Sequence, residues 1–239
     1  MTPNSHEIGP NLGLSRYPSC VSLPRAEKPY PAILDFLAQR FPYVGRAVWQ
    51  QRISQGKVLD EAGNPIGCET PYVPLRRLFY SREAQQEPLI PLEEKILFQN
   101  DELLVACKPP FLPVVPAGPY VNECLLHRLK LKTGNSELVP LHRIDRETSG
   151  LVLFSLRRAT RGLYGQLFSA GRIEKTYEAV AAVSQRLTAR EWTVENRLEK
   201  AEPWFRSKVV AGAINARSRI ELIHCNDQRA HFLLQPLIS

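Results

Sequence analysis

The segment Leu141-His142-Arg143-Ile144-Asp145-Arg146-Glu147-Thr148-Ser149-Gly150 is followed at once by the apolar run Leu151-Val152-Leu153-Phe154. The apolar run predicts a buried strand, and the polar segment before it predicts a loop at the mouth of that strand. In this loop Asp145 stands between Arg143 and Arg146. Neighbouring cations favour the ionised carboxylate, and an ionised Asp at a strand mouth can act as a nucleophile. From the residue pattern alone, a salt-bridged turn in which Asp145 or Thr148 caps backbone N–H groups is better supported.

Strand and helix patterns lie on both sides of this loop. Residues 96–98 and 103–106 are apolar runs joined by the turn Gln99-Asn100-Asp101-Glu102, which predicts a hairpin. The hairpin ends at Lys108-Pro109-Pro110, because proline cannot donate to a ladder. Helices are predicted at 122–131 and 160–170, and strands at 150–154, 174–183 and in several places between 190 and 236. Since strands and helices do not alternate regularly, the pattern predicts an α+β fold rather than α/β.

The first third of the chain predicts a separate, smaller module. Residues 1–30 contain five prolines and little apolar periodicity, so we expect an extended leader there. Residues 31–82 predict two short helices, near 33–37 and 45–54, followed by strands near 57–59 and 77–81. Residues 83–94 are rich in Gln, Glu and Pro and predict a linker to a larger domain at 95–239.

The charge distribution favours a polyanionic partner. The chain has a formal net charge of +7 and a pI near 9.3. Residues 1–139 hold 15 Lys and Arg against 14 Asp and Glu, a net of +1, whereas residues 140–239 hold 16 against 10, a net of +6. A basic excess gathered in one part of a chain is typical of proteins that bind nucleic acid. A merely basic soluble domain is the alternative.

Two further patterns argue against membrane and metal chemistry. No basic patch and apolar stretch opens the chain, and the longest apolar runs are far shorter than the ~20 residues that cross a bilayer. We therefore expect a cytoplasmic protein with no membrane contact. The five cysteines are scattered without a C-x-x-C pair, which indicates free thiols rather than a zinc site.

The segment His142–Gly150 resembles the signature H-R-[LI]-D-x-x-T-S-G of RluA-type pseudouridine synthases, and it agrees at every fixed position. Residues 100–109, which end in Lys108-Pro109, resemble the family's early hairpin, and Lys175-Thr176-Tyr177-Glu178-Ala179 resembles its K-x-Y-x-A strand. The resemblance covers roughly residues 95–236. It implies a mixed, largely antiparallel central sheet with flanking helices.

The resemblance also implies a reaction and its residues. The family isomerises uridine to pseudouridine in RNA without a cofactor or metal. Asp145 matches the essential carboxylate, Arg143 the side chain that fills the gap left by the flipped base, and Tyr177 the aromatic that stacks on the uracil. Read without the family, Arg143 could pair with a phosphate or carboxylate, Tyr177 could be a packed sheet aromatic, and His142 could contact RNA or make a structural hydrogen bond.

Residues 31–82 resemble, more weakly, a small RNA-binding module first recognised in a ribosomal protein. Two helices and a small sheet carry Arg40, Arg46, Arg52 and Lys57 in this region. Some pseudouridine synthases have an RNA-binding domain at the corresponding place. A small helical cap that makes no RNA contact is the alternative interpretation.

The C-terminal residues depart from the family pattern. After a strand like Leu233–Pro236 the family continues with T-G-R-x-H-Q-[IL]-R, whereas this chain reads Leu237-Ile238-Ser239. We therefore expect the catalytic domain to lack its C-terminal portion and, with it, a basic partner of the catalytic Asp. Arg217, Arg219 and Arg229 are candidate substitutes, and the sequence favours none of them.

Together these patterns predict a monomeric pseudouridine synthase acting on structured ribosomal or transfer RNA. An RNA-binding protein of the same fold that has lost catalysis is the alternative. A hydrolase with paired carboxylates is more remote, since it requires a second carboxylate ~5–10 Å from Asp145.

Overall fold

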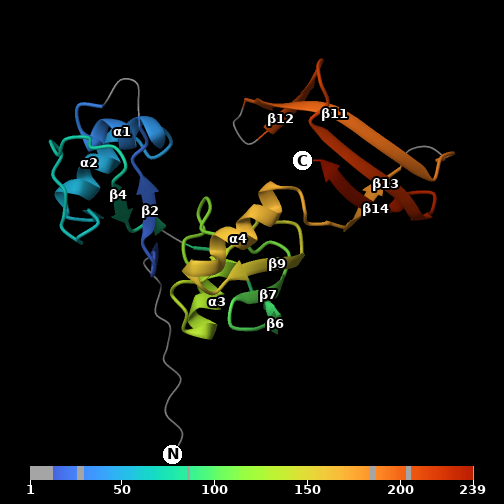
Figure 1. The fold of residues 1–239 in the computed structure, drawn as a ribbon, viewed down its shortest axis with the longest axis horizontal. Coiled ribbons are helices and arrows are strands. Elements are labelled where there is room, and N and C mark those ends of the chain that lie inside the picture. Colours follow the sequence, from blue (N-terminus) through green and yellow to red (C-terminus); the bar gives the residue numbers. More distant parts are fainter. Residues whose placement is uncertain (1–12, 26–29, 85–86, 184–186, 203–205, 239) are drawn as a thin grey trace, which may run out of the picture. The chain divides into compact units, whose positions relative to one another are not determined.

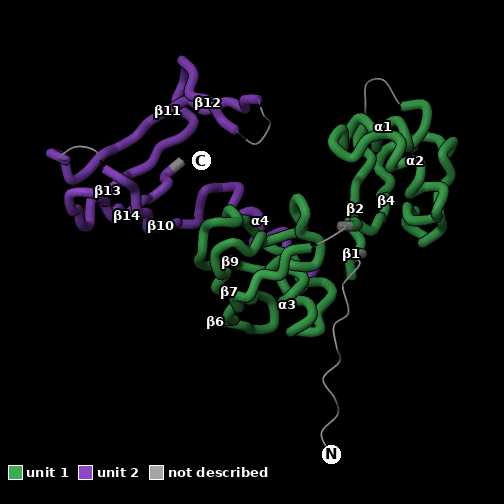
Figure 2. The backbone as a smooth tube through the Cα atoms, turned by 180° about the vertical axis from the view of Figure 1, so that it is seen from behind, with its two compact units in different colours: residues 1–157 green, residues 158–239 purple. Residues whose placement is uncertain are grey.

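The computed structural model describes residues 13–25, 30–84, 87–183, 187–202 and 206–238 (Figure 1). The chain divides into two compact units, Met1–Arg157 and Arg158–Ser239 (Figure 2). This division lies inside the domain predicted at 95–239. The two units are described separately below, and the domain boundaries drawn from the sequence stay predictions.

The N-terminal subdomain, residues 13–84 of unit 1, combines two helices with short strands (Figure 1). Its helices are α1 (Ile33–Arg40) and α2 (Arg46–Ser54), and its strands are β1 (Gly13–Leu14), β2 (Ser19–Ser22), β3 (Val58–Leu59), β4 (Arg77–Tyr80) and β5 (Glu83–Ala84). Strands β2, β4 and β3 form one antiparallel sheet in that order, and β1 pairs with β5. The helices and strands predicted between residues 31 and 82 are confirmed.

The apolar spacing that predicted the first helix is the spacing that builds the core of this subdomain. Ile33, Leu34, Phe36 and Leu37 of α1 are all buried, together with Trp49 of α2. At the start of α1 the Asp35 carboxylate accepts a hydrogen bond from the Ala32 backbone N–H at 3.0 Å. This contact satisfies one of the donors that a helix leaves unpaired at its N-terminus.

The segment expected to be a leader contributes to this subdomain. Strand β2 pairs with β4 along four residues, from Ser19 opposite Tyr80 to Ser22 opposite Arg77. Leu23, just beyond β2, is 1% exposed and belongs to the core. The expectation of an extended leader up to residue 30 is therefore corrected for 13–23, because backbone pairing and one buried leucine hold this stretch in place. Residues 1–12 and 26–29 lie outside the described residues.

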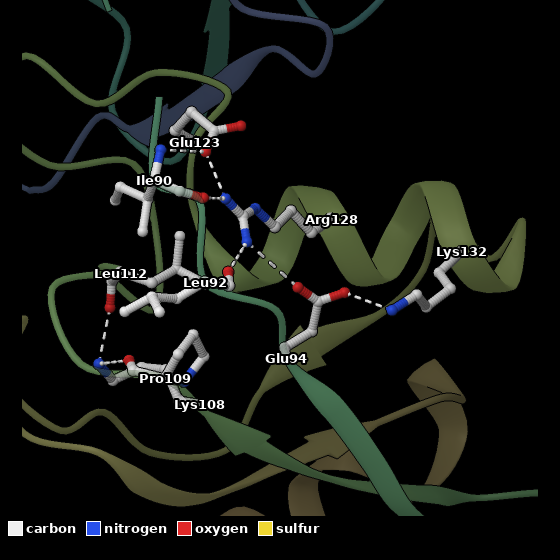
Figure 3. Close-up of polar contacts among 9 residues, drawn as sticks. All are labelled: Ile90, Leu92, Glu94, Lys108, Pro109, Leu112, Glu123, Arg128 and Lys132. Carbon is white, nitrogen blue, oxygen red and sulfur yellow. Dashed lines mark hydrogen bonds and ion pairs between the residues drawn. The ribbon is translucent and has the colours of Figure 1, made fainter. Parts of the chain in front are cut away.

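The segment expected to be a linker is likewise held in place. The guanidinium of Arg128 donates to the carbonyl oxygens of Ile90 and Leu92, and both distances are 2.6 Å. Figure 3 shows these two contacts. The same guanidinium pairs with Glu94, which Lys132 also binds at 2.7 Å. Residues 90–94 therefore lie along helix α3 and do not form a loose spacer. The composition of residues 83–94 correctly predicted a polar stretch, but it did not predict that Arg128 and Lys132 would bind this stretch.

The remainder of unit 1 is a four-stranded antiparallel sheet with one helix. Its strands are β6 (Lys95–Gln99), β7 (Leu103–Lys108), β8 (Val139–Pro140) and β9 (Gly150–Ser155), in the order β6-β7-β9-β8, and its helix is α3 (Leu125–Thr133). Alternate residues of β7 are buried, as expected for a strand with one face on a core. Leu104 and Ala106 of β7, Val152 and Phe154 of β9 and Leu129 of α3 form the centre of this core. The predicted hairpin and helix are confirmed.

Unit 2 contains one helix and a five-stranded sheet. Its elements are α4 (Arg158–Ser169), β10 (Tyr177–Ala182), β11 (Glu191–Ala201), β12 (Arg206–Val210), β13 (Ala216–Cys225) and β14 (Arg229–Ile238), with strand order β10-β14-β13-β11-β12. All strand pairs among the described residues of both units are antiparallel. The α+β class with largely antiparallel sheets is confirmed. Among the helices described, none is long and apolar enough to span a membrane.

Candidate active site

The signature segment forms the loop between β8 and β9 in unit 1. Leu141 and His142, at its start, are tied to β9. The Leu141 backbone N–H donates to the Leu153 carbonyl at 2.8 Å, and the Leu153 N–H donates to Nε2 of His142 at 3.1 Å. His142 therefore makes the structural hydrogen bond that was one of its two expected roles.

Asp145 lies at the exposed part of this loop. Its backbone carbonyl accepts a hydrogen bond from the Thr148 N–H at 3.2 Å, which closes a tight turn. The Asp145 side chain is exposed. Among the described residues no backbone N–H or side chain is hydrogen-bonded to its carboxylate, so the turn is held by backbone atoms and not by the side-chain cap that the residue pattern alone favoured. The carboxylate oxygens remain accessible to a reactant.

Lys108 supports this loop through a hydrogen bond to its backbone. The residue is fully buried at the end of β7, and its ammonium donates to three backbone carbonyls: Leu112 at 2.7 Å, Pro109 at 2.9 Å and Arg146 at 3.0 Å. Figure 3 shows the first two of these contacts, with the Nζ atom between the carbonyl oxygens of Pro109 and Leu112. The third contact fixes the backbone immediately after Asp145.

The electrostatics of this ammonium link it to the loop carboxylates. Burial lowers the pKa of Lys108 to about 8, while the negative charges of Glu147 and Asp145 act in the opposite direction. An amine with this pKa is still mainly protonated at neutral pH. Lys108 is thus a buried positive charge bonded to the backbone of the turn that carries Asp145.

The two arginines that flank Asp145 behave differently from each other. Arg146 forms an ion pair with Glu147 at 2.6 Å and lies 5.8 Å from the centre of the Tyr120 ring. Hydrogen bonding from Arg146 lowers the pKa of the exposed Glu147 carboxyl. The turn is therefore salt-bridged, as the residue pattern alone favoured, but through Glu147 and not through Asp145. Arg143 is exposed, and among the described residues it pairs with no carboxylate.

The remaining predicted site residue lies in unit 2. Tyr177 is the first residue of β10, is half-buried and stands opposite Leu234 of β14. Arg217 and Arg219, two of the candidate basic substitutes, pair across the sheet with Glu195 and Glu191. The role of Tyr177 at the site stays a prediction, as do the roles of Asp145 and Arg143.

Metal-ligating residues do not gather anywhere in the described part of the chain. No group of three or more His, Cys, Asp or Glu side chains there is placed to hold a metal ion. All five cysteines are free thiols. At this loop the described residues offer three groups for chemistry. They are the exposed carboxylate of Asp145, the buried ammonium of Lys108 and the guanidinium of Arg143, which pairs with no described carboxylate.

Comparison with known families shows which family the chain belongs to. Residues 102–238, more than half of the chain, match the model of the RNA pseudouridylate synthase family. The chain belongs to this family. The match begins in the turn before β7 and includes Lys108, the signature loop and the whole of β10 to β14.

Individual pseudouridine synthases give the same assignment. An uncharacterised RNA pseudouridine synthase of Synechocystis is 37% identical over 130 residues, 54% of this chain and 44% of that protein. RNA pseudouridine synthase 7 of Arabidopsis thaliana is 30% identical over 62% of this chain and 37% of its own length. tRNA pseudouridine synthase C of Haemophilus ducreyi is 33% identical over 37% of each chain. The chain spans less than half the length of these curated relatives.

A solved structure shows the same fold. The human RNA pseudouridylate synthase domain containing protein 1 matches with a TM-score of 0.51 and 17% identity, over 64% of this chain and 63% of that one.

The contact of Lys108 with the signature loop was not predicted from the sequence. The residue pattern predicts that Lys108-Pro109-Pro110 ends a hairpin, and the resemblance matches Lys108-Pro109 to the end of the family's early hairpin, but neither gives Lys108 a role. The signal available was a lysine at a position where the alternation of β7 requires an inward-facing side chain. A buried lysine requires polar partners, and three carbonyls provide them here.

Proposed function

We propose that this protein isomerises uridine to pseudouridine in RNA, with Asp145 as the essential carboxylate. The observation that carries the proposal is the exposed Asp145 side chain in the loop before β9. The buried Lys108 ammonium holds this loop through a hydrogen bond to the Arg146 backbone carbonyl. A carboxylate that is accessible and unpaired can reach a nucleoside. Membership of the pseudouridylate synthase family supports this reaction over other uses of a single carboxylate.

The neighbouring residues fit the physical demands of this reaction. A uridine stacked in a helix cannot reach Asp145, so the base must be flipped out at a cost of a few kcal/mol. Arg143 is exposed, and its guanidinium can stack and donate hydrogen bonds in the space that the base leaves. We assign Tyr177 to stacking on the extruded uracil, an interaction of about 1–3 kcal/mol per base.

We further propose that the substrate is a structured ribosomal or transfer RNA and that the protein acts as a monomer in the cytoplasm. One relative is a tRNA pseudouridine synthase by name, which supports transfer RNA as the first substrate to test. The net charge of +7 suits a polyanionic substrate.

The test is release of tritium from RNA that carries uridine labelled at carbon 5. We expect release with the parent protein, none with Asp145→Asn, and nearly unchanged release with the matched control Glu147→Gln. Glu147 is also an exposed loop carboxylate, but it is paired with Arg146. Equal release from the parent and Asp145→Asn would remove Asp145 from the mechanism.

Two other outcomes distinguish the alternatives. Salt-dependent RNA binding without tritium release, indifferent to Asp145→Asn, identifies an RNA-binding protein that has lost catalysis. Free uracil in the reaction mixture identifies a hydrolase instead.

A further inference from the structure

The turn that follows β7 presents an aromatic side chain to solvent. Phe111 is 54% exposed, whereas Leu112 and Val114, just after it, belong to the hydrophobic core of unit 1. The φ angle of Phe111 is 66°, in the left-handed region, and in the described part of the chain only Leu75 shares this property among residues other than glycine. This conformation is unfavourable for any residue with a Cβ atom, because the Cβ approaches the following carbonyl oxygen. Phe111 therefore does not serve the fold: its backbone is strained, and its ring gains little from burial.

Contacts on both sides of Phe111 hold the turn in this conformation. The Lys108 ammonium donates to the carbonyls of Pro109 and Leu112, at 2.9 and 2.7 Å, so the turn closes around a buried cation (Figure 3). Just beyond the turn, two N–H groups at the start of α3 donate to the carbonyls of residues 113 and 114, at 2.8 and 3.0 Å. A strained residue persists where its surroundings over-determine the backbone. The backbone that carries the ring is therefore fixed.

The same ammonium joins this turn to the signature loop. Its third hydrogen bond, of 3.0 Å, is to the carbonyl of Arg146. Phe111 and Asp145 thus each directly precede a residue whose carbonyl accepts a hydrogen bond from the one Nζ atom. The exposed ring and the exposed carboxylate are carried by two adjacent turns of the same unit.

We propose that Phe111 stacks on an unpaired nucleobase next to the uridine that enters the site. Extrusion of a uridine leaves each neighbouring base without a stacking partner on one side, and an aromatic ring offers such a base a replacement surface. Backbone strain is concentrated at binding sites, where a fixed conformation prepares a contact before the ligand arrives. That the planar group is a base rests on the proposed function; the fixed, exposed ring beside the signature loop does not.

The chemistry of the side chain sets what this contact distinguishes. A phenyl ring carries no charge and no hydrogen-bonding group, so it cannot read the edge of a base. Every base has a π face, and stacking on it is tolerant of sequence. Phe111 therefore favours RNA in which the neighbour of the target uridine is unpaired and accessible, and it does not select one base by its edge.

The first test asks whether the ring is packed in the protein. Glycine adopts a positive φ without strain, so Phe111→Gly should leave the midpoint of urea denaturation at or above the parent value. Leu75→Gly is the control for relief of strain, since Leu75 has a φ of 67° and is 67% exposed. A lower midpoint for Phe111→Gly than for the parent shows that the ring stabilises the fold, and it overturns the proposal.

The second test measures RNA affinity with the full chain. Unmodified transfer RNA transcripts are titrated with Asp145→Asn protein, so that binding is measured without turnover, and KM for tritium release is measured with the active protein. Phe111→Leu keeps the apolar bulk and removes the π face. We expect this change to weaken binding by about fivefold or more and to raise KM equally with kcat unchanged, and Phe111→Tyr to restore the parent values.

Phe98→Leu is the matched control for loss of an exposed ring. Phe98 lies in β6, is 51% exposed, and pairs with Val105, three residues before Lys108 on β7. This change should alter affinity by less than about twofold, because a surface substitution away from a binding site has little effect. Equal weakening by Phe98→Leu and Phe111→Leu overturns the contact.

Removal of a base identifies the partner of the ring. Where tritium release locates the modified uridine, a stem–loop of that transfer RNA is synthesised with an abasic residue on one side or the other of it. Loss of the stacked base should weaken binding of the parent ring and leave no further loss for Phe111→Leu, because both changes remove one contact. Additive losses at both neighbouring positions overturn the stacking.

The two readouts keep this contact distinct from the proposed function. Weaker transfer RNA binding by Phe111→Leu and not by Phe98→Leu, without tritium release, supports the contact and counts against the isomerisation. Tritium release by Phe111→Leu at the parent KM removes the contact and leaves the proposed function intact. Absence of measurable transfer RNA binding in every variant overturns the contact as well.

Discussion

Replacement of Lys108 with methionine tests how the signature loop is held. The substitution keeps an unbranched side chain of similar length and removes the ammonium. In the native protein this group is fully buried and donates to the carbonyls of Pro109, Leu112 and Arg146 at 2.7 to 3.0 Å. Because the Arg146 carbonyl directly follows Asp145, its release affects the position of the carboxylate as well as the stability of the fold.

The expected loss follows from two opposing effects. Each hydrogen bond from a charged donor contributes about 1.5–3 kcal/mol, and three are lost. Against this, burial lowers the pKa of Lys108 from 10.5 to about 8, and at 1.36 kcal/mol per pKa unit the variant avoids a desolvation cost of about 3 kcal/mol. The net decrease in the free energy of unfolding is about 1.5 to 6 kcal/mol at pH 7.

Urea denaturation measures this decrease, and hydrogen exchange locates it. We expect the amides of the loop between β8 and β9 to lose protection more than those of α1, and tritium release to fall below the level set by the folded fraction. Lys95→Met, at an exposed position of β6, is the control and should change stability by less than about 0.5 kcal/mol. A Lys108→Met protein as stable as the parent, with an unchanged loop, would refute the assignment of Lys108 as the support of Asp145.

Two further perturbations test the contacts of α3. Arg128→Met leaves the Ile90 and Leu92 carbonyls without donors and Glu123 without its cation, so the free energy of unfolding should fall by about 3–5 kcal/mol. Lys132 is half-exposed, so Lys132→Met should lower it by less than about 1 kcal/mol. Urea denaturation measures both losses. Equal losses would contradict the structure. Burial lowers the pKa of His127 from 6.5 to about 4, so the unfolded chain binds more protons between these pH values and stability falls as pH decreases through this window, by up to about 3 kcal/mol. Unfolding measured from pH 4 to 7 should show a shallower dependence for His127→Gln, and identical curves would argue against this assignment.

The sequence predicted those parts of the fold and site that depend on local pattern. The apolar run after the signature, the hairpin before Lys108 and the helical spacing of Ile33 to Leu37 all correspond to elements of the structure. Each is decided by alternation or helical period within a few residues. The exposed position of Asp145 also follows locally, since a polar loop cannot be buried without partners.

Features that depend on distant partners could not be predicted. The pairing of β2 with β4 joins residues nearly sixty positions apart, and the proline-rich composition around Ser19–Ser22 gave no sign of it. Arg146 pairs with Glu147 and not with Asp145, and this pairing depends on side-chain geometry within one turn. Of four basic residues noted in the N-terminal module, Arg46 and Lys57 form ion pairs with Asp35 and Glu83, partners that the sequence pattern did not indicate.

The strand order of unit 2 has a consequence for how the chain is made. Strand β10 pairs with β14 and with no other described strand, although β11, β12 and β13 lie between them in sequence. During synthesis, residues 177–182 therefore leave the ribosome about fifty residues before their partner, whereas the β6-β7-β9-β8 sheet of unit 1 needs nothing beyond residue 155. The long segment between β10 and β14 makes their pairing slow. Until β14 has been synthesised and has paired, the unpaired edge of β10 is prone to aggregation. Unit 1 should thus be able to fold on the nascent chain, and the yield of native protein should depend on how well β10 is protected until β14 arrives.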